Sequence, residues 1–503
     1  MSGNVKDAEI LVKSFASLCR SATPIYDIVN KGGEAFLEIQ VGNITDNLAD
    51  KLQKAKDDNP ENQFNDTAYL VKKKINNWLD SIESDILQNV ISESLTIGRH
   101  SLNSDFYKKF IPSVGGEEKR IATLTNTIVY GRRGAGKSSL ILYGCNKVIE
   151  QNQPFVWIAL QQYHNRDDLQ VIPQVLYEIV SQLSGEIKEE DKTRLLSIIH
   201  DLENIGVNIG FNEIKIKLPL FSRHLMPIVN AKGAIFIFLD DLHLVGRNIQ
   251  PLLLSALYSF CRGNNIFLKI SAIENLTKLY DYQQKEGLEV PGDLQSVVLD
   301  YNLMTPQKTF NHINEIILSY ILYSGIPSFG SLCDIRARQR LTWVSAGVPR
   351  DALYIFNNAI TQAKNSNRKK IAIVDLNMAA SESMSEKEKY ITDDIEDDPS
   401  TLKTYLEKIK MFCFNDSKLN AFLVHKDPSN PNYKLIRKLI DLRFLHILHP
   451  GITPDRRNEK YEVLLLDYAF YTGFRRNPSV KEFKATPQSP SAKELRNLKK
   501  FRI

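Results

Sequence analysis

The stretch Gly131-Arg132-Arg133-Gly134-Ala135-Gly136-Lys137-Ser138 contains every residue type that a phosphate-binding loop requires. It follows an apolar, β-branched run, Thr127-Ile128-Val129-Tyr130, and precedes a pattern typical of a helix over residues 138–149. Its glycines let backbone N–H groups point at a phosphate, and the helix that begins near Gly136 adds the positive end of its dipole. The motif therefore predicts a nucleotide-binding protein with the order strand, loop, helix.

Two side chains of this loop have a specific expected chemistry. Lys137 is expected to reach the β- and γ-phosphate oxygens of ATP, and the Ser138 hydroxyl is expected to ligate Mg²⁺. The residues expected to surround the phosphates with them are Gly131, Arg132, Arg133, Gly134, Ala135, Gly136 and Ser139. The alternative, a glycine-rich turn without a ligand, is disfavoured by the flanking strand and helix.

Length and composition restrict the class of protein. A chain of 503 residues is too long for one hydrophobic core, and about three domains are expected. Its 43% hydrophobic and 24% charged residues are typical of a soluble globular protein. No apolar run is long enough to span a membrane, there is no signal-peptide pattern, and the five cysteines lack disulfide or zinc spacing. We therefore expect a cytoplasmic protein without a membrane segment.

Apolar strand-like segments alternate with helical patterns between residues 120 and 305. Strands are expected at residues 127–130, 155–160, 234–239, 266–273 and 296–299, with helices to 151, over 169–183 and over 251–261. This alternation is typical of an α/β P-loop fold, in which helices cover both faces of a mostly parallel sheet. The nucleotide is then expected at the carboxyl ends of the strands.

The remaining sequence divides by composition. The expected domains are a helical N-terminal region of unknown role (1–115), the ATPase core (116–305), an α-helical lid (306–385), an acidic linker (386–400), a winged-helix domain (401–475) and a tail (476–503). Nine basic and two acidic residues lie between Arg475 and Ile503, so this tail is expected to be disordered. It either contacts nucleic acid or only keeps the chain soluble.

Two acidic residues follow the apolar run over residues 235–239. Asp240 is expected to hold Mg²⁺ through its water shell, and Asp241 to orient or deprotonate the attacking water. Glutamate is more frequent than aspartate at the second position in hydrolytic members of this class. Because aspartate is one methylene shorter, we expect slow turnover. An acidic pair is also a common loop start, but its combination with a phosphate loop favours the metal site.

Two further polar groups are candidates for the γ-phosphate. The strand over residues 266–273 is expected to lie between the other two strands of the site. The polar group at its end is expected to be Ser271, Glu274 or Asn275, and we favour Asn275. The alternative is that this residue is an ordinary turn residue without a role at the phosphate. Pro349 is expected in the first turn of a helix and places Arg350 at a helix N-terminus, where only a nearby anion favours a cation. Arg350 would otherwise pair with Asp351 or solvent.

Basic residues accompany an apolar helical stripe in the C-terminal part. The helix is expected over residues 433–445, and a hairpin follows it, which together are typical of a winged helix. The residues expected to contact double-stranded DNA are Lys434, Arg437, Lys438 and Arg443 on the helix and Arg456 and Arg457 at the hairpin tip. The alternative is a winged helix that binds protein, with these residues on its solvated face.

Taken together, these features resemble the AAA+ ATPases of the origin-recognition-complex and archaeal initiator type, over roughly residues 110–475. The resemblance rests on the phosphate loop, Leu239-Asp240-Asp241, the strand after it, the Gly-x-Pro-Arg motif of the lid and the winged-helix candidate. It implies that Lys137, Ser138 and Asp240 bind Mg-ATP and that Arg350 is a second sensor, which couples the lid to the γ-phosphate. It also implies an ATP-stabilised homo-oligomer or DNA-engaged state.

The chain departs from that pattern in two places. The spacing from Lys137 to Asp240 is long, which indicates an insertion around residues 184–220. No arginine lies where the trans-acting finger is usually recognised, and the substitutes are Arg262, Arg336, Arg338 and Arg340. The second departure puts ring formation in doubt more than it does ATP binding.

The function expected is a slowly hydrolysing ATPase switch that engages DNA through the winged helix. The alternative is a signal-transducing or antiphage-defence NTPase, in which the winged helix and the N-terminal region, residues 1–115, bind a protein partner. Both alternatives use the same nucleotide site.

Overall fold

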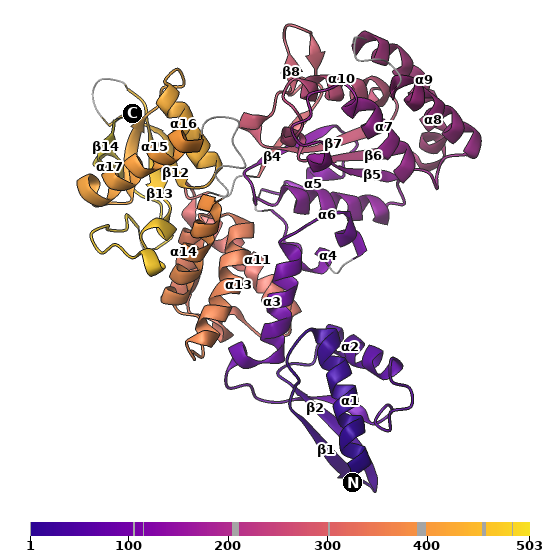
Figure 1. The fold of residues 1–503 in the computed structure, drawn as a ribbon, viewed down its shortest axis with the longest axis vertical. Helices are drawn as coiled ribbons and strands as arrows, with labels where there is room; N and C mark the ends of the chain where they lie inside the picture. Colours follow the sequence, from indigo (N-terminus) through magenta and orange to yellow (C-terminus); the bar gives the residue numbers. More distant parts are fainter. Residues whose placement is uncertain are drawn as a thin grey trace. The chain divides into compact units, whose positions relative to one another are not determined.

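The computed structural model describes residues 2–103, 106–113, 115–203, 211–299, 302–389, 399–454, 459–484 and 486–502 (Figure 1). It divides into two compact units, one of Ile97–Asp300 and one that joins Met1–Thr96 to Tyr301–Ile503. No helix within the described ranges has both the length and the apolar character that a membrane span requires.

The unit of Ile97–Asp300 is built on a five-stranded parallel sheet with the order β10-β4-β7-β6-β5. Its strands are β4 (Thr127–Gly131), β5 (Phe155–Ala159), β6 (Ile235–Asp240), β7 (Ile266–Ala272) and β10 (Gln295–Leu299). All five strands and their parallel pairing were expected, so the predicted α/β P-loop fold is confirmed.

Helices cover both faces of this sheet, and β6 is therefore buried along its whole length. Phe236 and Phe238 pack in one core with α6 (Lys137–Glu150), whereas the alternate residues Ile237 and Leu239 pack in another. The second core includes α7 (Val171–Gln182), α10 (Ile249–Cys261), α8 (Glu189–Glu203) and α9 (Phe211–Lys232). The last two helices account for most of the insertion expected around residues 184–220. Shorter elements of this unit are α4 (Phe106–Lys109), α5 (Glu118–Ile121), β8 (Tyr280–Asp281) and β9 (Glu286–Gly287).

The N-terminal region is not all helical, so that expectation is wrong. It contains α1 (Ser2–Cys19), α2 (Asp46–Asp57) and α3 (Ile82–Ser94), but also a three-stranded sheet of β1 (Tyr26–Lys31), β2 (Glu34–Val41) and β3 (Ala68–Lys72). The physical reason is visible in β2, where Leu37, Ile39 and Val41 are buried and alternate with partly exposed residues. That period of two is the signature of a strand with one buried face.

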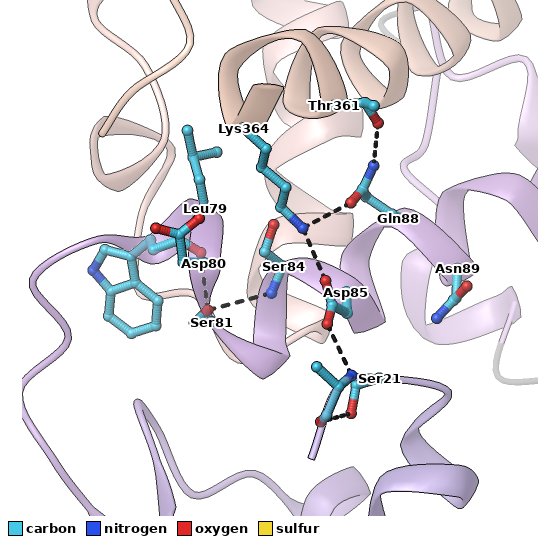
Figure 2. A network of polar contacts seen from close by, with 12 residues as sticks. Ser21, Leu79, Asp80, Ser81, Ser84, Asp85, Gln88, Asn89, Thr361 and Lys364 are labelled. Atoms are coloured by element: carbon cyan, nitrogen blue, oxygen red, sulfur yellow. Dashed lines mark hydrogen bonds and ion pairs between the residues drawn. The ribbon is translucent and has the colours of Figure 1, made fainter. Parts of the chain in front are cut away.

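Residues 1–96 of the N-terminal region and the helical lid belong to one unit, in which α3 contacts α13 (Pro349–Asn365). Figure 2 shows the polar part of this contact, in which Lys364 Nζ lies 2.8 Å from Asp85 Oδ1 and 3.0 Å from Gln88 Oε1. The Gln88 amide donates in turn to Thr361 Oγ1 at 2.9 Å. Apolar residues of α3 and α13 share one core beneath these contacts.

The lid is helical, as predicted, and contains four α-helices within the described residues. They are α11 (Pro306–Tyr323), α12 (Ile335–Val344), α13 and α14 (Ile373–Lys389). The acidic linker expected over residues 386–400 is wrong at both ends, because residues 386–389 complete α14 and residues 399–400 begin α15 (Pro399–Met411). Residues 390–398 lie outside the described ranges.

The C-terminal domain contains a four-stranded sheet with the order β12-β13-β11-β14. After α15 come β11 (Ala421–His425), α16 (Pro431–Asp441), β12 (Leu445–Ile452) and β13 (Tyr461–Leu466), followed by α17 (Ala492–Arg496) and β14 (Lys500–Phe501). The helix predicted over 433–445 ends earlier, at Asp441, and Leu445 already belongs to β12. The predicted hairpin is formed by β12 and β13, which pair antiparallel.

The basic tail is folded, so the prediction that residues 476–503 are disordered is wrong. Strand β14 pairs in parallel with β11, and Leu495, Leu498 and Phe501 are buried in the core. The Phe501 ring lies 5.3 Å from the ring of Phe412 and 5.9 Å from that of Phe422, measured between centroids. The apolar area that these three residues bury stabilises the folded conformation of the tail despite its positive charge.

This contact predicts the effect of shortening the last aromatic residue. Phe501→Ala should lower the free energy of unfolding by about 3 kcal/mol, because it removes a buried ring and leaves a cavity. Urea denaturation measures the change, with Arg502→Ala, an exposed neighbour, as the matched control. Equal stabilities for the two variants would show that the tail does not pack.

Candidate nucleotide-binding site

The phosphate loop joins β4 to α6 in a conformation that needs its glycines. Gly134 and Gly136 have φ angles of 78° and 97°, in the left-handed region that favours glycine. Gly136 is the N-cap of α6, and its carbonyl accepts the backbone N–H of Leu140 at 2.9 Å. The helix thus begins at Lys137, as predicted, and directs its free N–H groups at the loop.

The side chain of Lys137 folds back over this loop. It is 6% exposed, and its Nζ donates to the carbonyl oxygens of Gly131 at 3.2 Å and Arg132 at 3.3 Å. The same nitrogen lies 3.9 Å from Asp241 Oδ1. These weak partners are all oxygens, so phosphate oxygens of a nucleotide can replace them and form stronger, charge-assisted bonds.

Asp240 ends β6 as a buried carboxylate that is 6% exposed. Its Oδ1 accepts the hydroxyl of Ser271 at 2.5 Å, and the Ser138 hydroxyl also bonds to this carboxylate. Burial, and secondly the charge of Asp241, raise the pKa of Asp240 to about 6, while these hydroxyls and Lys137 act in the opposite direction. A buried carboxylate with this pKa lacks full charge compensation.

Magnesium fits that deficit. Ser138 and Asp240 together offer a hydroxyl and a carboxylate oxygen, which are hard donors of the kind that Mg²⁺ prefers. No group of three or more His, Cys, Asp or Glu side chains in the described part of the chain is arranged to hold a metal ion. The ion would therefore be held by these two residues together with nucleotide phosphates and water, as is usual for Mg²⁺ in phosphoryl-transfer sites.

Asp241 adopts a left-handed backbone conformation, with φ 61° and ψ 51°. Aspartate tolerates this region better than most residues, and the Asp241 N–H donates to Ser271 Oγ at 2.8 Å. Its side chain is 32% exposed, and the carboxylate lies 3.9 Å from both Lys137 Nζ and His243 Nδ1. Asp241 is therefore the more accessible of the two acids, whereas Asp240 is enclosed.

Strand β7 lies between β4 and β6, as predicted, but the residue it brings to the acidic pair is Ser271. Ser271 is fully buried and bonds to both aspartates, whereas Asn275, the favoured candidate, is exposed in a short 3-10 turn, η5 (Glu274–Leu276). The signal was available, because Ser271 is a small polar residue near the end of an otherwise mostly apolar strand.

Arg350 belongs to the other unit, where it is an exposed residue in the first turn of α13. The carboxylate of the next residue, Asp351, is taken by Lys387 Nζ at 2.7 Å and by the guanidinium of Arg443 at 2.5 Å. Although burial raises the pKa of Asp351, these two cations lower it to about 2. Asp351, which was considered as the alternative partner of Arg350, is thus bonded to Lys387 and Arg443.

The predicted DNA-contacting residues have different surroundings. Arg443 is 14% exposed and bound to Asp351, so a contact of this guanidinium with DNA was wrongly expected. Lys434 is exposed, Lys438 is half-buried on the same helix, and Arg437 Nη1 lies 3.6 Å from the buried carboxylate of Glu462. The two arginines of the hairpin tip, Arg456 and Arg457, lie outside the described residues.

The raised pKa of Asp240 predicts how stability depends on pH without Mg²⁺. The folded protein holds this proton more tightly than the unfolded chain, whose carboxyl pKa is about 3.9, so ionised Asp240 costs stability as the pH rises through 6. Asp240→Asn should then raise the free energy of unfolding at pH 7.5 by on the order of 2 kcal/mol. The gain should shrink at pH 5.0. Urea denaturation with a chelator measures both values, and a less stable variant at pH 7.5 would contradict the assignment.

Comparisons with known proteins give similarities of structure alone. The chain is similar to the Orc1 protein of Aeropyrum pernix solved in complex with DNA, with 14% identity, a TM-score of 0.39 and coverage of 73% of this chain and 93% of that one. It is similar to Drosophila ORC bound to DNA, with 12% identity, a TM-score of 0.37 and coverage of 76% and 89%. It is also similar to Thermotoga maritima RuvB, a Holliday junction branch migration motor, with 12% identity, a TM-score of 0.29 and coverage of 63% of this chain and 76% of that one. No family model and no curated protein matches the chain. What it binds is therefore inferred from its own site residues.

Proposed function

We propose that this chain is a Mg²⁺-dependent AAA+ ATPase that acts as a nucleotide-dependent switch. The observation that carries the proposal is the convergence of Lys137, Ser271 and the pair Asp240-Asp241 at the carboxyl ends of three adjacent parallel strands, β4, β7 and β6. The position of β7 between β4 and β6 is the order that the resemblance to AAA+ ATPases implies. The five cysteines are free and buried, which fits the proposed cytoplasmic location.

In the binding step, the loop residues 131–139 surround the phosphates with backbone N–H groups. Lys137 exchanges the carbonyl oxygens of Gly131 and Arg132 for β- and γ-phosphate oxygens. Ser138 and Asp240 would hold Mg²⁺, and the ion would supply positive charge that neutralises the phosphates. Asp240 then gains the charge compensation that its buried position lacks.

In the hydrolytic step, Asp241 orients the attacking water and accepts its proton. Its partly exposed carboxylate is accessible to such a water, whereas Ser271 fixes the backbone beneath it. The short side chain of aspartate limits how well the carboxylate reaches that water. Slow turnover follows from this constraint.

Within its own unit, the lid connects Arg350 to the C-terminal domain. Arg350 senses the γ-phosphate in this proposal, and its neighbour Asp351 holds Lys387 of α14 and Arg443, just after α16. Because a buried ion pair is costly to break, movement of the first turn of α13 is transmitted to the C-terminal domain rather than absorbed.

Double-stranded DNA is the proposed partner of the C-terminal domain, which contributes Lys434, Arg437 and Lys438 of α16 to the proposed contact. Arg456 and Arg457, which lie outside the described residues, stay candidates from sequence. The pairing of Arg437 and Arg443 with carboxylates weakens this proposal and favours the alternative, a protein partner bound by the same domain or by the N-terminal region.

ATP-dependent self-association is also proposed. Of the arginines considered as a trans-acting finger, Arg340 is unsuitable, because both oxygens of Glu482 lie 2.8 Å from its Nη2. Arg338 lies over the ring of Phe329 at 5.3 Å from its centroid, which also argues against a role toward another copy. Arg262 and Arg336 stay candidates.

The nucleotide site is tested by two substitutions that separate binding from hydrolysis. Lys137→Ala should abolish ATP binding, because no other ammonium in the loop replaces the phosphate contact. Asp241→Asn should keep binding and stop hydrolysis, since asparagine also tolerates the left-handed backbone of this position. Fluorescent-nucleotide titration and phosphate release measure the two steps. Unchanged ATP affinity of Lys137→Ala would exclude the assignment.

The DNA proposal is tested by the salt dependence of binding. Each phosphate contact contributes about 0.9 to the slope of log K against log salt, so Lys434→Glu with Lys438→Glu should reduce the slope by about 1.8. The control is Lys493→Glu, which makes the same substitution at an exposed lysine of α17. Duplex DNA binding that neither substitution changes would exclude α16 as the interface. Salt-insensitive capture of a protein without DNA would favour the alternative.

A further inference from the structure

A histidine that the sequence analysis did not single out lies beside the acidic pair. His243 is in the 3-10 turn η4 (Leu242–Leu244), and its side chain is 4% exposed. Its Nδ1 is buried without a hydrogen-bond partner within the described residues and lies 3.9 Å from Asp241 Oδ1. A buried nitrogen without a partner costs free energy, so its retention here calls for a reason.

Two backbone hydrogen bonds join the turn that bears His243 to the neighbouring segment, residues 165–166. The N–H of Asn165 donates to the carbonyl of Leu244 at 2.9 Å, and the N–H of Gly246 donates to the carbonyl of Arg166 at 2.8 Å. A Cβ at Gly246 would lie 2.4 Å from that Arg166 oxygen, so the two segments are in close contact. The backbone of His243 is thereby fixed, and the imidazole and Asp241 can approach only by small side-chain rotations.

The electrostatic surroundings keep the imidazole neutral. Burial, followed by the charges of Lys137 and Arg133 and by His164, lowers the pKa of His243 to about 3. A neutral imidazole has one N–H and one acceptor nitrogen. In the tautomer with the proton on Nδ1, it can donate a hydrogen bond to a carboxylate without adding a charge beside the phosphates.

Asp241 lies between two donors at equal distance, since Lys137 Nζ and His243 Nδ1 are each 3.9 Å from its Oδ1. Without nucleotide, the ammonium of Lys137 attracts this carboxylate. When Lys137 turns to the phosphates, Asp241 loses that attraction, and His243 is the buried donor adjacent to it.

We propose that His243 is a positioning residue of the ATPase site, whose Nδ1–H binds Asp241 when nucleotide fills the loop and directs its carboxylate at the attacking water. This inference rests on the proposed ATPase function and deepens it. Asp241 then exchanges partners between the empty and the occupied site. His243 itself contacts neither the nucleotide nor the water.

The test compares three substitutions of His243 that differ in where, or whether, the side chain places a hydrogen-bond donor. In His243→Asn, the side-chain amide nitrogen can occupy nearly the position of Nδ1, whereas in His243→Gln it reaches that of Nε2; His243→Ala has no donor. We expect kcat to fall about 10- to 100-fold in the Ala and Gln variants, the loss typical of one hydrogen bond to a charged group. His243→Asn should recover most of this loss, and KM for ATP should stay within about twofold in all three.

The control is His312→Ala in α11, where another buried histidine lies in the other unit. It should alter stability without altering kcat. Wild-type kcat in His243→Ala, or an equal loss in the Asn and Gln variants, would overturn the positioning role while leaving the ATPase proposal intact. If the wild-type chain hydrolyses no ATP and Asp241→Asn changes nothing, the proposed function itself fails.

Discussion

The buried carboxylate of Asp240 is the constraint on which the nucleotide site depends. It binds Ser271 of β7 and Ser138 of α6, so one side chain fixes three elements relative to one another. Because an ionised group in this position needs compensation, the site is incomplete without a cation. The contact of β6 with Ser271 and Ser138 and the need for a cation therefore both depend on one buried acid at the end of β6.

A second buried acid has the corresponding role in the other unit. Asp351 has its compensation within the protein, because Lys387 and Arg443 lower the pKa of its carboxyl to about 2. This cluster connects α13 to α14 and to the end of α16, and the opposite end of α13 contacts α3 through Lys364. One helix thus bears the proposed sensor Arg350 and contacts both flanking regions. That arrangement is suited to a switch, in which a small change at one end of a rigid helix moves packed neighbours.

The parallel sheet and the phosphate loop were predictable from sequence because their signals are local. Each strand is a short, mostly apolar run, and glycine, lysine and serine in the loop have fixed spacing. The acidic pair was predictable for the same reason. Ser271 was underrated and His243 was missed because their importance comes from what lies across the sheet or the turn, which no local pattern reports.

Two of the errors, those on the tail and on Arg443, also come from contacts between residues far apart in the chain. The tail was judged by its charge, although Leu495, Leu498 and Phe501 are three residues apart and bury against a domain that begins about a hundred residues earlier. Arg443 was judged by its place beside a helix, whereas its partner Asp351 is 92 positions away in the chain. In β2, the alternation of Leu37, Ile39 and Val41 was a local signal that the helical interpretation overlooked.

Isothermal titration of the purified chain with ATP, with and without Mg²⁺, tests the central claim most directly. The account predicts saturable binding of one ATP per chain that Mg²⁺ strengthens, because the cation compensates the buried charge of Asp240. Absence of binding in both conditions, or binding that Mg²⁺ does not affect, would contradict it.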